Sequence, residues 1–130
     1  MKTIPDLTGA ICESLVRQDY WYEGEKSEGV HLLFLKIAGG KWHRFFFDCG
    51  PLFWREVEAP DAWDTTRADK HHYEQTEIGR EHGLIGIAIA EVVHQDLVPQ
   101  PEVVIRFQNG TRLVLQDFCE YQTLSVLCTL

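Results

Sequence analysis

The chain has 130 residues and a mass of 15.0 kDa, which is the size of one ordinary domain with a core of its own. Hydrophobic residues make up 45% and charged residues 25%, as in globular proteins, so disordered and fibrous classes are excluded. Asp and Glu number 20 against 12 Lys and Arg, and the net charge of -8 argues against binding a phosphate backbone and favours a cationic partner.

The cysteines and the amino terminus bear on the cellular compartment. No two of the four cysteines form a CxxC pair, so a zinc ribbon or thioredoxin-type site has no support and four reduced thiols are expected. Pro5 and Asp6 stand where a signal peptide needs an apolar stretch, and no apolar run is long enough to cross a bilayer. We therefore expect a cytoplasmic protein that does not enter a membrane.

The first predicted element, at residues 7–19, is repeated later in the chain. It aligns without a gap to residues 84–96, and both stretches read as β-strands. The alternative is a helix at residues 6–16, but Gly9 in its first turns and the β-like residues 84–93 favour the strand. Five aligned positions are identical: Leu7/Leu84, Gly9/Gly86, Val16/Val93, Gln18/Gln95 and Asp19/Asp96.

Each copy then continues through the same order of elements. Three strand-like runs follow in each, at residues 30–37, 42–47 and 52–57 and at residues 103–107, 111–115 and 123–130. Gly39 and Gly40 in the first copy, and Asn109 and Gly110 in the second, mark a tight hairpin between the first two runs. The pattern predicts a mainly β fold: two internally repeated antiparallel β-meanders, about eight short strands, forming a sandwich or a curved sheet.

An acidic linker at residues 58–83 joins the two copies, residues 7–57 and 84–130 of a single domain spanning 1–130. It holds seven acidic and three basic residues, which is half of the net charge. A structureless loop of this length is uncommon in a compact domain. We therefore expect part of the linker, around residues 65–76, to form a short helix or to pack on the sheet through Trp63 and Tyr73.

Aromatic and acidic residues lie together in a second acidic loop, predicted at residues 19–28, and around Trp63 in the linker. Aromatic rings supply contact area that loses water on binding, and carboxylates steer a basic protein toward it. In the alternative interpretation the rings only cover sheet edges while the acids keep the surface soluble. The candidate partner-binding residues are Tyr20, Trp21, Tyr22, Glu23, Glu25, Asp61, Trp63 and Asp64.

Residues that could carry chemistry form no complete motif. His71, His72 and His82 lack the spacing that places two ligands on one face of a helix, so no metal site is predicted. The serines lack the Gly-x-Ser-x-Gly elbow, and no glycine-rich phosphate loop is present. An enzyme is therefore disfavoured and no cofactor is expected, although a site assembled from distant residues would leave no motif.

We expect a small acidic interaction protein that binds a basic protein and no nucleic acid. Its most concrete form is an immunity-type inhibitor that occludes a toxin or nuclease, because occlusion needs only complementary charge and fast association. One alternative is a small-ligand-binding or enzymatic β-sandwich, with a pocket near Trp42, Trp54, His43 and Asp48. Another is a structural subunit that forms a homodimer through the edge strand at residues 123–130.

Overall fold

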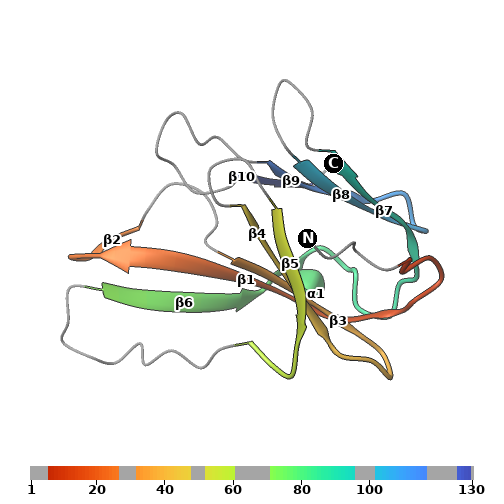
Figure 1. The fold of residues 1–130 in the computed structure, drawn as a ribbon, viewed down its shortest axis with the longest axis horizontal. Helices are drawn as coiled ribbons and strands as arrows, with labels where there is room; N and C mark the ends of the chain where they lie inside the picture. The colour runs from red at the N-terminus through yellow and green to blue at the C-terminus, as the bar shows by residue number, and fades with distance from the viewer. Residues whose placement is uncertain are drawn as a thin grey trace.

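The computed structural model of the chain describes residues 6–26, 32–47, 52–60, 71–95, 102–116 and 126–129. These residues form ten strands and one short helix. The strands belong to two antiparallel sheets (Figure 1). Buried residues of both sheets form one hydrophobic core. The mainly β fold of two repeated meanders, with a short helix in the linker, is confirmed.

The first sheet is built around one long strand, β1. Its strands are β1 (Cys12–Tyr22), β2 (Glu25–Lys26), β3 (Leu32–Ile37), β4 (Trp42–Phe47), β5 (Leu52–Val57) and β6 (His71–Glu77). Val16 of β1 pairs with both Phe34 of β3 and Glu77 of β6, so these two strands flank β1 on opposite edges. β4 and β5 extend the sheet beyond β3, and β2 turns back on the end of β1.

The second sheet repeats the meander of the first, and its described strands include no counterpart of β2 or β6. Its strands are β7 (Ile89–Gln95), β8 (Glu102–Phe107), β9 (Arg112–Gln116) and β10 (Val126–Thr129). They lie in the order β10-β9-β8-β7, so each strand is next to its neighbour in the chain. β7, β8, β9 and β10 therefore correspond to β1, β3, β4 and β5.

The first strands of the two halves match in their local geometry. A turn precedes each of them, and Gly9 and Gly86, which occupy aligned positions in these turns, both have a φ of +85°. Each strand then carries a register irregularity at the aligned place, directly after Cys12 in β1 and directly after Ile89 in β7. The positive φ explains why glycine stands at both turn positions, since an L side chain is strained there.

The two halves meet where these turns lie against each other. An isolated β-bridge pairs Ile11 with Ala88. Four backbone hydrogen bonds of 2.7–3.0 Å surround the bridge: Gly9 N to Ile89 O, Cys12 N to Ile87 O, Gly86 N to Cys12 O and Ile89 N to Ala10 O. Each half donates two of them and accepts two, so the junction is symmetric between the copies.

The shared core is filled by aligned residues of both halves. The pairs Cys12/Ile89, Leu33/Val103, Leu35/Ile105, Ile37/Phe107 and Phe45/Leu115 are all buried. A further aligned pair places an imidazole opposite an aliphatic side chain. His43 faces Leu35 across β3 and β4, as Leu113 faces Ile105 across β8 and β9, and both are buried. The first half thus holds an ionisable ring where the second holds a leucine.

The connecting segments differ from the sequence prediction in two places. Around residues 65–76 we expected a short helix or packing on the sheet; residues 65–70 lie outside the described residues, residues 71–77 form strand β6, and the described helix of the linker is α1 (Ile78–Glu81). β6 is polar, and it is extended because it pairs with the outer edge of β1. The prediction of an acidic loop at residues 19–28 is wrong for residues 19–22, which belong to β1, and for residues 25–26, which form β2.

Candidate functional site

The outer part of β1 forms a projecting arm, defined here as residues 20–26 and 71–74. Among the described residues, β1 pairs with β3 as far as Gln18, whereas its pairing with β6 and β2 continues to Tyr22. Figure 1 shows β1, β2 and β6 extending to the left, away from the second sheet. Five of the eight candidate residues lie on this arm: Tyr20, Trp21, Tyr22, Glu23 and Glu25.

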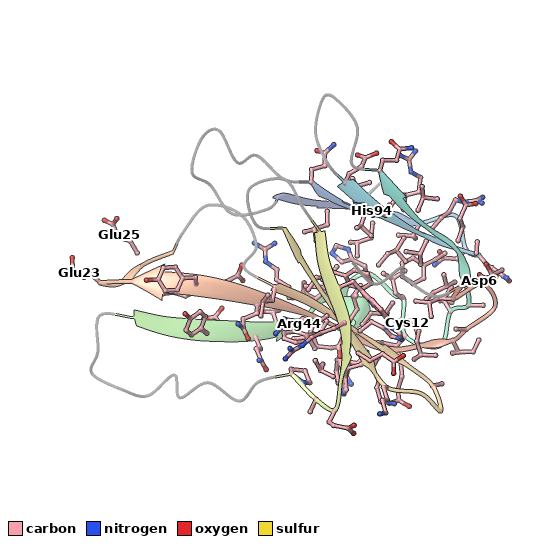
Figure 2. All side chains as sticks on the ribbon, in the orientation of Figure 1. Asp6, Cys12, Glu23, Glu25, Arg44 and His94 are labelled. Atoms are coloured by element: carbon pink, nitrogen blue, oxygen red, sulfur yellow. The ribbon has the colours of Figure 1, made fainter. Side chains whose placement is uncertain are left out.

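The tip of the arm is a tight turn with an uncommon residue. Glu23 and Gly24 connect β1 to β2 with φ values of 50° and 81°, the two positive values of a type I′ hairpin turn. Asn, Asp or Gly is preferred at the first position, and another L residue there costs about 1 kcal/mol. Glu23 and Glu25 are exposed, and Figure 2 shows them far from Cys12 and His94.

Side chains that pair across β1 and β6 hold the body of the arm. Tyr20 lies opposite Tyr73, with ring centroids 5.4 Å apart and ring planes inclined by 43°. Two residues further in, the amide of Gln75 donates to Oε1 of Gln18 at 2.9 Å, and Gln18 is fully buried. Such cross-strand pairs fix the register of the two strands, so the aromatic and acidic groups of the arm keep a fixed spacing.

One acid of the predicted acidic loop is not presented to a partner. Asp19 is only 2% exposed, and its two carboxylate oxygens accept from Nε of Arg17 at 2.8 and 3.1 Å. A buried carboxylate needs such a partner, because an unpaired charge away from water is strongly unfavourable. The exposed acids of the arm are instead Glu23, Glu25 and Glu74, the last of which the sequence interpretation missed.

Glu77 fixes the inner end of β6 to β1. Its carboxylate accepts from the N–H of Leu15 at 2.8 Å, from the N–H of Gly79 at 3.1 Å and from the hydroxyl of Ser14. The carboxylate thus continues the pairing of β1 where β6 leaves its edge, and it also caps α1. Gly79 packs so closely here that a Cβ atom would lie 2.9 Å from Cδ1 of Ile85. The arm therefore has a rigid base.

The structure brings together only part of the predicted surface. Tyr20 and Trp21 are half-buried, because each has a paired strand beside it. Three candidates in the linker lie outside the described residues, and their part in partner binding stays a prediction: Asp61, Trp63 and Asp64. Tyr73, which was expected to pack on the sheet, does so against Tyr20.

The alternative site near Trp42, Trp54, His43 and Asp48 is only partly assembled. Trp54 Nε1 donates to Nδ1 of His43 at 3.1 Å, and the two rings stack with centroids 5.7 Å apart. Burial lowers the pKa of His43, with the charge of Glu56 opposing the shift, which favours the neutral ring whose Nδ1 can accept this hydrogen bond. Successive strand residues face opposite sides, which puts Trp42 on the other face of β4, and Asp48 lies outside the described residues.

The other reactive groups of the described ranges form no recognisable site. Cys12 is buried and not disulfide-bonded, and burial together with the negative charge of Glu77 raises its pKa to about 12, which makes the thiol unreactive. The described residues contain no group of three or more His, Cys, Asp or Glu placed to hold a metal ion. Nor do they include a helix with the length and apolar character that crossing a membrane requires.

Comparison of the chain with protein-family models, curated proteins and solved structures finds no match. No function can therefore be carried over from a relative. The arm and its tip are interpreted from their own geometry and charge.

Proposed function

We propose that this chain is an interaction protein that binds a basic protein through the tip of the arm. The observation that supports this most directly is Glu23. A type I′ turn is most stable with Asn, Asp or Gly at this position, so a Glu with a φ of 50° lowers stability at the end of the arm, where it is exposed. Residues held in such sparsely populated conformations are concentrated at functional sites.

The chemistry of the arm suits a cationic surface. The carboxylates of Glu23, Glu25 and Glu74 are exposed, and the half-buried rings of Tyr20 and Tyr73 lie on the same two strands. Carboxylates accelerate encounter with a basic partner, and aromatic rings provide contact area that loses water on binding. The net charge of -8 adds long-range attraction and repels acidic competitors.

In the most concrete form of the proposal, the partner is a cationic toxin or nuclease and the chain inhibits it by covering its active site. Inhibition of this kind needs complementary charge and fast association but no catalytic group. Asp61, Trp63 and Asp64, which lie outside the described residues, are part of the same proposed binding surface. A cytoplasmic location is part of the same proposal.

The test uses the whole chain, immobilised and exposed to a lysate of its native host. It should retain a basic protein whose binding weakens as salt is raised. Replacing Glu23→Gln together with Glu25→Gln should weaken that binding by about tenfold, mainly through slower association. Glu56→Gln together with Glu58→Gln removes the same charge from exposed positions outside the arm and should change the affinity by less than about twofold.

A further variant separates binding from folding. Glu23→Asn suits the type I′ turn, so it should raise the urea midpoint of unfolding while it weakens binding to the retained protein. A purely structural role for Glu23 would move both quantities in the same direction. The proposal is wrong if the arm variants bind as tightly as the unaltered chain, or if the control pair loses as much affinity as the arm pair.

A further inference from the structure

The outer edges of β1 and β7 are equivalent in the repeat but are covered differently. β6 lies along the outer edge of β1 over residues Val16 to Tyr22. β7 is the last strand of its sheet and, within the described ranges, pairs with β8 alone. The strands at the other ends, β5 and β10, close their sheets in the same way in both halves. The difference between the halves therefore lies at the outer edge of β7.

The repeat shows which backbone groups of β7 face outward. The N–H of Leu15 points away from β3, toward Glu77, at 2.8 Å. Val92 of β7 is aligned with Leu15 of β1. Both residues follow the register irregularity of their strand, and Val92 pairs with Ile105 as Leu15 pairs with Leu35. The N–H of Val92 therefore points away from β8, to the edge where the first half supplies an acceptor.

We propose that this edge pairs antiparallel with β7 of a second copy, so that the two four-stranded sheets join into one. An antiparallel strand is what covers the equivalent edge of β1, and two identical β7 strands meet antiparallel about a two-fold axis. With Val93 on the axis, Val92 and His94 form the hydrogen-bonded pair across the interface. Over Val93–Gln95 the interface would thus repeat the pairing that β6 makes with the aligned residues Val16–Gln18 of β1.

The side chains of β7 are compatible with this register. Glu91, the acidic residue of the strand, lies opposite Gln95 of the second copy rather than opposite itself, and Arg106 already pairs with Glu91 at 2.6 Å. Val93 lies on the same outer face, because it pairs across the ladder with Val104. The strand has neither Lys nor Pro, the residues that commonly prevent pairing at a sheet edge.

The location of the edge allows the dimer to form without blocking the arm. Figures 1 and 2 place β7 at the right of the molecule and the exposed Glu23 and Glu25 at the left end. A two-fold dimer through β7 therefore carries two arms that point away from the interface. Doubling the arms raises the avidity for a partner or surface that presents more than one basic site.

The first measurement is the mass of the whole chain in solution from low micromolar to near-millimolar concentration. The mass should rise with concentration from 15.0 kDa toward twice that value. Val93→Lys sets two like charges opposite each other on the axis and should weaken self-association by roughly fivefold to tenfold. Val104→Lys places the same charge on the same face one strand further from the axis and should have little effect.

A cross-linking experiment tests the register without a disruptive change. In the proposed pairing, residue 93 of each copy belongs to a non-hydrogen-bonded pair, whose Cα atoms lie about 4.5 Å apart, within reach of a disulfide. Val93→Cys should therefore form a covalent dimer under mild oxidation. Val104→Cys and the unaltered chain, with its native cysteines, serve as controls and should remain uncross-linked.

Three results would overturn the proposal. They are a monomeric mass at every concentration, a dimer that Val93→Lys leaves unchanged, and cross-linking at residue 104 equal to that at residue 93. Circular dichroism of each variant checks that it is folded. None of these results bears on the arm, since β7 contributes no residue to it.

Discussion

Within the residues that the structure describes, the two halves of the molecule repeat one meander, but only the first carries added strands. Both begin with a glycine turn and a strand with the same register irregularity. β1 is then flanked by β6 and extends to Tyr22, whereas β7, which is described as far as Gln95, pairs with β8 alone within the described ranges. The repeated parts therefore build the core and the junction, and the additions to the first half build the surface on which we place function.

The largest effect is expected from a change that separates β6 from β1. In Gly79→Ala the added Cβ would lie 2.8 Å from Oε2 of Glu77 and 2.9 Å from Ile85, so the free energy of unfolding should fall by roughly 2–3 kcal/mol. Urea denaturation measures this loss. Gly40→Ala is the control, since its Cβ meets only Ile37 at ordinary contact distances and it should cost under about 1 kcal/mol. Equal losses would show that the base of the arm is not tightly packed.

A smaller and symmetric effect tests whether the halves are equivalent. Gly9→Ala and Gly86→Ala each force an L side chain into a φ of 85° with open space around the Cβ, so strain alone should cost about 1 kcal/mol in each. Thermal unfolding of the two variants should show matching losses. An Asn at either position should cost less than Ala, because Asn tolerates positive φ. A loss at one turn only would contradict the equivalence of the halves.

The smallest effect concerns the aligned core pair His43 and Leu113, which sets an imidazole against a leucine. Burial lowers the pKa of His43 below its ordinary value of 6.5. As the pH falls through 6.5, His43 therefore takes up a proton more readily in the unfolded chain than in the folded chain. Stability should therefore decline as the pH falls through the region of 6.5, and Trp54 fluorescence should report the loss of its hydrogen bond to His43. His43→Leu, which copies the second half, should flatten this dependence. The exposed His82→Gln should preserve it, and an unchanged slope in His43→Leu would assign the pH dependence to other groups.

The strands with apolar runs and clear turns could be predicted from the sequence. The runs at residues 42–47 and 52–57 coincide with β4 and β5, because their apolar residues are bounded by glycines and polar loops. β6 could not be predicted as a strand, since His71–Glu77 has no apolar face and becomes extended only by pairing with β1. The same long-range pairing buries Asp19, with which the predicted acidic loop began, and the polar side chain of Gln18.

The candidate surface shows the same division between local and distant information. Glu23 and Glu25 could be identified as exposed acids from their neighbours in the chain, and the structure places both at the tip. Glu74 and the ring of Tyr73 join them only because β6 returns along β1. No local pattern encodes which distant segment will lie beside a strand, so the part of the arm that β6 contributes could not be predicted from the sequence.

The symmetric junction around Ile11 and Ala88 has a consequence for how the halves depend on each other. Each half donates two backbone hydrogen bonds there and accepts two, so a fragment with one half alone would leave four polar groups without partners. A second fragment of the same kind could supply them, since the exchange is reciprocal. The junction is in this sense a dimer interface inside one chain, and the connecting residues 58–83 act as a tether that raises the effective concentration of one half for the other.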